Sequence, residues 1–132
     1  MKKSKSRLTA FVLWTLFILI VVGIPGSYIP KPVSFWRLLS PDKIVHIFLF
    51  GPFAFLLLRY LFSLPELHSK IKFPLLLTFF IGIIYATITE LLQFFVFLGR
   101  NGNIYDAIAD TVGVITGIYI YQKWNRKKDN GI

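Results

Sequence analysis

The chain has 132 residues, 55% of them hydrophobic, and its formal net charge is +9. Its fourteen phenylalanines are more than a small soluble core could bury, which excludes an ordinary soluble domain and indicates an integral membrane protein. The chain contains no cysteine, which excludes disulfide bonds and thiol chemistry.

Four segments approach the roughly 20 apolar residues that cross a bilayer. They are continuously apolar, without the period-two alternation of half-buried strands, and this pattern predicts helices. The loops between them leave no room for a second domain, so we expect one all-α domain over residues 1–132, a bundle of four transmembrane helices. The segments run over Leu8 to Ile24, Ile44 to Phe62, Phe73 to Leu98, and Ile104 to Gln122.

Basic residues gather before the first segment and after the last one. Under the positive-inside rule this predicts that both termini are cytoplasmic. The positive charge is then a topology signal, so we expect a multi-pass protein of the cell membrane and no nucleic-acid partner. These basic residues are Lys2, Lys3, Lys5 and Arg7 at the start, and Lys123, Arg126, Lys127 and Lys128 at the end.

The first apolar segment follows a basic start, as the core of a secretory signal peptide does. Its apolar run is longer than that of a usual signal peptide, and no A-x-A-like cleavage site follows it. We therefore interpret it as the first membrane span.

The second segment begins with Pro41, which suits the first position of a helix, and with Asp42, which the helix dipole favours there. His46 comes four residues after Asp42 and shares its helix face. A carboxylate beside an imidazole fixes its tautomer and could prepare it for proton transfer or metal binding. The alternative is that His46 is a hydrogen-bonded packing residue.

The third segment contains Glu90, its only charged residue. A carboxylate within a membrane span is costly, so a partner or a function is expected for it. Gln93 is three residues further on the same face, and we expect both side chains to point into one space. If the helix continues to Gly99, Glu90 lies roughly 13 Å from that end, in the outer half of the membrane.

The fourth segment follows Asn103, a suitable helix cap, with Asp106 three residues later in an arrangement like a capping box. Asp106, Asp110, Gly113 and Gly117 continue along one face. The two glycines belong to a series of small residues that lets membrane helices approach closely, either within one copy or in a homodimer. Such an approach would bring both aspartates toward His46, Glu90 and Arg100.

Taken in order, these fragments resemble the VanZ-like family over about residues 42–117. Asp110 departs from the family pattern, which more usually has Asn at that position. The fragments are Asp42-Lys43-Ile44-Val45-His46 with Phe50-Gly51, Thr89-Glu90-Leu91-Leu92-Gln93-Phe94, Gly99-Arg100, and Asp106 with Gly113 and Gly117.

The resemblance implies a small multi-pass protein of a bacterial membrane. The family is named for a member linked to teicoplanin resistance. Because teicoplanin acts on cell-wall precursors at the outer leaflet, a site opening outward would face the same side. This implies a link to the cell envelope without identifying a reaction.

Three functions agree with these observations. In the first, Arg100 and Lys43 hold an anionic cell-envelope lipid or a lipid-linked cell-wall precursor, and the acidic residues orient the arginine or relay protons. In the second, the protein is an enzyme that modifies such a lipid, with His46 or Glu90 as general acid or base. In the third, the charged residues only lock the helices together.

The sequence contains no H-E-x-x-H pattern, nucleophile motif or phosphate-binding glycine loop. A metal could be held by His46, Glu90, Asp106 and Asp110, but we expect no metal and no cofactor. We expect membrane lipids as partners. The predicted ligand-binding residues are Asp42, Lys43, His46, Glu90, Gln93, Arg100, Asp106 and Asp110.

Overall fold

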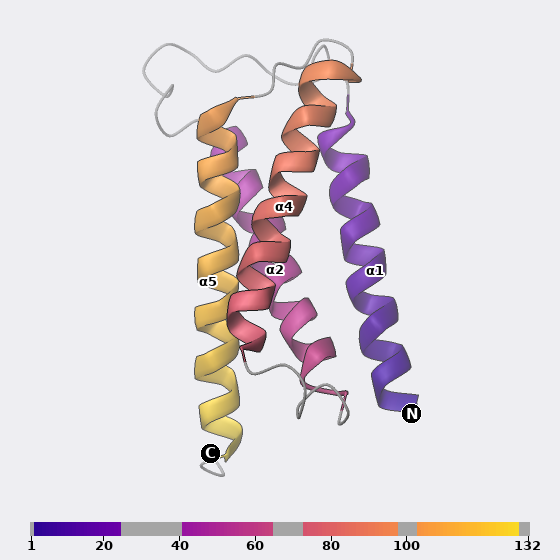
Figure 1. Cartoon of the computed structure of the whole chain (residues 1–132), viewed down its shortest axis with the longest axis vertical. Coiled ribbons are helices and arrows are strands. Elements are labelled where there is room, and N and C mark those ends of the chain that lie inside the picture. Colours follow the sequence, from indigo (N-terminus) through magenta and orange to yellow (C-terminus); the bar gives the residue numbers. More distant parts are fainter. Residues whose placement is uncertain (1, 25–40, 65–72, 98–102, 130–132) are drawn as a thin grey trace.

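The computed structural model describes residues 2–24, 41–64, 73–97 and 103–129, and these residues form four helices and no strand. The expectation of an all-α protein is therefore confirmed. The helices lie alongside one another, with both chain ends at the same end of the bundle (Figure 1). They are α1 (Lys2–Val22), α2 (Pro41–Leu61), α4 (Pro74–Phe95) and α5 (Ile104–Asp129).

The helices extend further into the basic ends of the chain than the apolar segments predicted. α1 begins at Lys2 instead of Leu8, and α5 continues past Gln122 to Asp129. Lysine and arginine are good helix formers, and basic side chains in the last turn of α5 oppose the partial negative charge of that helix end.

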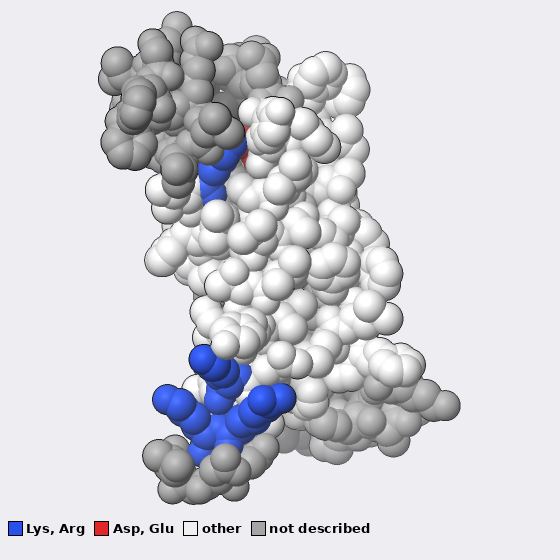
Figure 2. Space-filling model, turned by 90° about the vertical axis from the view of Figure 1, so that its left-hand side faces the viewer, with Lys and Arg blue, Asp and Glu red and all other residues white. Residues whose placement is uncertain are grey.

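Three of the described helices are long and apolar enough to cross a membrane: the stretches Lys3–Val22, Asp42–Leu61 and Pro74–Phe95. α5 is more polar because Asp106 and Asp110 lie in its first two turns. From the side of α5, basic side chains gather at the end where the chain terminates, and the surface above them is uncharged over most of its length (Figure 2).

The buried core contains residues of all four described helices, and aromatic rings of α2 and α4 contact one another within it. The ring centroids of Phe53 and Tyr85 are 5.0 Å apart in a stacked arrangement, and Phe50 lies 5.8 Å from Tyr85. α1 is tied to this core by two hydrogen bonds. The indole N–H of Trp14 donates to the carbonyl of Leu49 at 2.8 Å, and the hydroxyl of Tyr85 donates to the carbonyl of Thr15 at 2.6 Å.

The most extensive helix pair is α2 with α5, where two glycines of α5 lie directly against the α2 backbone. A Cβ atom added to Gly113 would lie 2.7 Å from the carbonyl oxygen of Ile47, and one added to Gly117 would collide with the carbonyl of Gly51. Since no side chain separates the two helices here, their first turns also come close together. This contact sets His46 of α2 opposite the start of α5.

Candidate functional site

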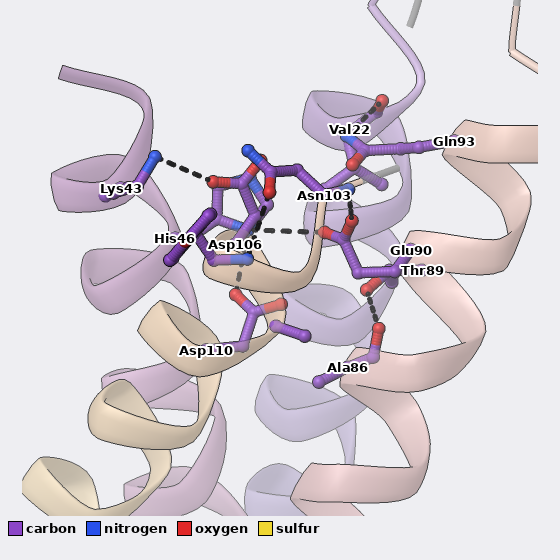
Figure 3. A network of polar contacts seen from close by, with 12 residues as sticks. Val22, Lys43, His46, Ala86, Thr89, Glu90, Gln93, Asn103, Asp106 and Asp110 are labelled. Atoms are coloured by element: carbon purple, nitrogen blue, oxygen red, sulfur yellow. Dashed lines mark hydrogen bonds and ion pairs between the residues drawn. The ribbon is translucent and has the colours of Figure 1, made fainter. Parts of the chain in front are cut away.

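A group of charged side chains gathers where α2 and α5 begin and α4 ends, at the opposite end of the bundle from the chain termini (Figures 1 and 3). His46, Glu90, Asp106 and Asp110 are all buried, and Asp110 has no exposed surface. We call this group the polar cluster. It consists of Asp42, Lys43, His46, Glu90, Asp106 and Asp110.

The contact at the centre of the polar cluster joins α2 to α5. Nδ1 of His46 lies 2.9 Å from Oδ1 of Asp110, and both side chains are fully or almost fully buried. The sequence led us to expect Asp42 as the carboxylate that fixes this ring. Asp42 is close, with a carboxylate oxygen within 4.8 Å of a His46 ring nitrogen, but the partner of Nδ1 is Asp110.

Glu90 brings α4 into the same cluster through its two carboxylate oxygens. Oε2 accepts a hydrogen bond of 2.8 Å from the backbone N–H of Asn103, and Oε1 lies 4.0 Å from Nδ1 of His46. The predicted depth of Glu90 needs correction, because α4 ends at Phe95 rather than at Gly99. Glu90 is thus about 8 Å from the end of its helix.

Asn103 caps α5, as expected, because its side-chain oxygen accepts the N–H of Tyr105 at 3.0 Å. The predicted capping box is wrong in its second half. In a capping box Asp106 would accept the N–H of Asn103, but Glu90 of the neighbouring helix accepts that N–H instead. The carboxylate of Asp106 lies 3.4 Å from Nζ of Lys43.

Gln93 and Glu90 are both on the buried side of α4, as expected, but their hydrogen bonds go to different helices. The side-chain N–H of Gln93 donates to the carbonyl of Val22 at 3.2 Å, so Gln93 connects α4 to α1. Glu90 instead faces α2 and α5 (Figure 3). One buried helix face therefore contacts two different neighbours.

Two carboxylate oxygens of the polar cluster have no hydrogen-bond partner among the described residues. They are Oε1 of Glu90 and Oδ2 of Asp110, and both atoms are buried. Buried oxygen atoms without a partner are costly in free energy, and native proteins usually satisfy them with water, an ion or a ligand. This part of the cluster therefore has unused capacity to accept a proton donor or a cation.

A hollow of about 280 Å³ adjoins the polar cluster between α4 and α5. Glu90 and Asn103 belong to its wall, and the rest of the wall is mostly apolar. We did not predict this hollow from the sequence, because the hollow depends on the spacing between two helices. Its lining residues are Thr87, Glu90, Leu91, Phe94, Asn103, Ile104 and Ala107.

Of the predicted ligand-binding residues, Arg100 lies outside the described part of the chain, so its place relative to the polar cluster stays a sequence prediction. The glycines predicted for helix packing, Gly113 and Gly117, lie against α2 of the same chain. The homodimer stays a prediction as well.

Comparison with known protein families gives a match over most of the chain. A family model described as VanZ/LLP1 matches residues 5–125. The match confirms the resemblance found from the sequence fragments and extends it from residues 42–117 to most of α1 and most of α5. No curated protein and no solved structure matches the chain.

Proposed function

We propose, given that the chain belongs to the VanZ/LLP1 family, that this membrane protein binds an anionic cell-envelope lipid or a lipid-linked cell-wall precursor. The binding site is the polar cluster together with the adjoining hollow. The site opens to the outer leaflet of a bacterial cell membrane, which would link the protein to glycopeptide susceptibility, including susceptibility to teicoplanin.

The proposed topology has four membrane crossings with both termini in the cytoplasm. It is supported by the two chain ends lying at one end of the bundle (Figure 1). The start of α1 and the end of α2 meet at that end, where Nη1 of Arg7 donates to the carbonyl of Arg59 at 3.2 Å. Basic side chains favour the cytoplasmic side, so this orientation puts the polar cluster on the outer side.

The observation that carries the proposal is the shared wall of the hollow and the polar cluster. A lipid has an apolar chain and a polar headgroup, and it needs both kinds of surface side by side. Leu91, Phe94 and Ile104 supply the apolar wall and are 51%, 62% and 71% exposed. Glu90 and Asn103 continue that wall into the polar cluster. The acyl chain would lie along the hollow, with its headgroup at the cluster.

The cationic groups for the headgroup would be Lys43 and Arg100. Lys43 is part of the polar cluster and is partly exposed, so its ammonium group could contact both Asp106 and a phosphate. Arg100 follows α4 in the sequence, and its planar guanidinium suits two-point contact with a phosphate.

A second candidate function is acid–base catalysis on such a lipid. The buried His46 and Asp110 pair favours it, because a carboxylate 2.9 Å from an imidazole nitrogen orients the ring and stabilises its protonated form. Glu90 would then be a further proton acceptor or donor beside the hollow. This candidate differs from binding alone because it predicts a changed lipid product.

The test is lipid retention by the purified protein, measured by native mass spectrometry. Phosphatidylglycerol and phosphatidylcholine with identical acyl chains are offered to the parent, to Ala107→Phe and to Ala10→Phe. Ala107 lines the hollow, whereas Ala10 is exposed on α1, so only Ala107→Phe fills the binding site.

We expect the parent and Ala10→Phe to retain phosphatidylglycerol preferentially, and Ala107→Phe to lose this preference. Equal retention of both lipids by the parent would overturn the binding proposal. A new mass in the recovered lipid would favour the enzyme.

A further inference from the structure

We propose that His46, Glu90 and Asp110 form a binding site for one divalent transition-metal ion, such as Zn²⁺ or Mn²⁺. From the sequence we expected no metal, because no metal-binding motif is present, although His46, Glu90, Asp106 and Asp110 were named as residues that could hold one. Here each ligand comes from a different helix, α2, α4 and α5. The site does not depend on lipid binding.

The distances between the three donor groups suit a small ion. Nδ1 of His46 lies 2.9 Å from Oδ1 of Asp110 and 4.0 Å from Oε1 of Glu90, and one donor atom from each residue lies within 4.8 Å of the others. Around a tetrahedral ion with bonds of about 2.1 Å, neighbouring ligand atoms are about 3.4 Å apart. Small side-chain shifts would bring all three atoms to that separation.

The second observation is that two buried oxygens of this group accept no hydrogen bond from the described residues. Oδ2 of Asp110 and Oε1 of Glu90 have no hydrogen-bond partner among the described residues, and Asp110 is completely buried. Both carboxylates point toward the His46 ring (Figure 3). A metal ion would give these oxygens a partner that the surrounding helices do not supply.

The formal charge of the three ligands also suits a divalent ion. Two ionised carboxylates and a neutral imidazole carry a formal charge of −2, which a divalent ion would cancel. Without an ion, two carboxylates at close distance in a dry environment repel each other. Without a metal ion, the two carboxylates would also repel an anionic headgroup bound at this site.

A neighbouring group of Asp42, His46 and Asp106 also has donor atoms within 4.8 Å of one another. It is the weaker candidate, because Asp106 is already 3.4 Å from the ammonium group of Lys43. A metal ion there would be repelled by that cation. Asp42 is also only half-buried, whereas all three proposed ligands are buried.

The donor set indicates the kind of ion. An imidazole nitrogen with two carboxylates suits Zn²⁺, Mn²⁺ or Fe²⁺, while Mg²⁺ and Ca²⁺ prefer sites made of oxygen atoms alone. Glu90 also lines the hollow, so the remaining coordination positions would face it. If the proposed lipid binding holds, the ion would there contact an anionic headgroup.

The test is a titration of the chelator-treated protein with CoCl₂, in detergent without added lipid. Bound Co²⁺ is followed by its visible absorption, and ZnCl₂ is then added to displace it. The variant Asp110→Asn keeps the shape of the ligand and removes its charge. Two controls change residues of the same types that are not among the proposed ligands: Glu66→Gln, and His68→Gln, which changes the chain's other histidine.

We expect saturation at one ion per chain and displacement by Zn²⁺. Asp110→Asn should weaken binding by roughly tenfold or more, since losing even an outer-shell partner weakens metal sites by roughly 10- to 100-fold. Both controls should bind like the parent. No saturable binding by the parent, or unchanged affinity in Asp110→Asn, would overturn the proposal.

Circular dichroism shows whether each variant keeps its helices. If Asp110→Asn does not fold, Glu90→Gln is titrated in its place, with the same two outcomes. The parent titration decides the question even if neither variant folds. Because no lipid is added, failure of the metal site and failure of lipid binding are separate results.

Discussion

Nδ1 of His46 is bonded to Asp110 of α5 at 2.9 Å, although Asp42 stands one turn away from His46 on its own helix. The glycine contact explains this choice of partner. Because Gly113 and Gly117 let the backbones of α2 and α5 touch, the two first turns lie side by side and Asp110 reaches the ring. The geometry of the polar cluster therefore depends on packing deeper in the bundle.

That dependence predicts that Gly117→Ala destabilises the protein. Its new Cβ would collide with the carbonyl of Gly51, and overpacking of this kind costs roughly 1–3 kcal/mol. The matched control is Gly51→Ala in the same interface, whose Cβ would meet only the Gly113 carbonyl at 3.6 Å, an ordinary contact. Thermal unfolding in one detergent should give a lower midpoint for Gly117→Ala alone. Equal midpoints for the two variants would contradict the close helix contact.

The cap of α5 gives a second prediction. Asn103→Ala removes the side-chain acceptor of the Tyr105 N–H and should cost about 1 kcal/mol of unfolding free energy. Asn103→Ser restores an acceptor and should recover most of this loss. Both variants keep the backbone N–H that Glu90 accepts, so the hydrogen bond between Glu90 and the start of α5 can form in each of them. Chemical denaturation provides the measurement, and a Ser variant as unstable as the Ala variant would argue against the cap.

The topology can be tested directly because the chain has no cysteine of its own. Tyr105→Cys introduces a thiol at the polar-cluster end, where Tyr105 is 60% exposed, and Lys128→Cys introduces one at the exposed end of α5. In intact cells a membrane-impermeant maleimide should label Tyr105→Cys only. Lys128→Cys should become labelled after permeabilisation. The reverse pattern would place the polar cluster on the cytoplasmic side.

The sequence predicted the four helices of the described residues well, because long apolar segments have few alternatives to a helix in a membrane. It also predicted that polar residues of three helices meet, since their chain order and spacing put them at one level. The hydrogen-bond partners of the individual side chains were less predictable. Helical periodicity identified the buried face carrying Glu90 and Gln93, but it does not tell which neighbouring helix each residue contacts.

Two other features of the site depend on contacts between helices, which a local sequence pattern does not predict. Asn103 has a cap sequence, yet its N–H goes to Glu90 because α4 ends beside the start of α5. The hollow beside Glu90 exists because of the spacing between these two helices, which periodicity does not specify. The sequence suggested an anionic-lipid site around Arg100 and Lys43. It did not predict the apolar wall proposed for that site, because the wall depends on the spacing between α4 and α5.

In the proposed function, Glu90 serves a ligand rather than the stability of the bundle. The most direct test is the thermal unfolding midpoint of the parent and of Glu90→Gln, each with added phosphatidylglycerol or phosphatidylcholine. The substitution keeps an oxygen acceptor for the Asn103 N–H and removes the charge.

We expect Glu90→Gln to unfold at the parent's temperature or above it in phosphatidylcholine, because a buried charge retained for function often lowers stability. Phosphatidylglycerol should raise the midpoint of the parent and not that of the variant, because in the proposed site the acidic residues orient the cationic groups that hold the headgroup. A sharp fall of the midpoint for Glu90→Gln in both lipids, with no preference of the parent for phosphatidylglycerol, would show instead that the carboxylate holds the helices together.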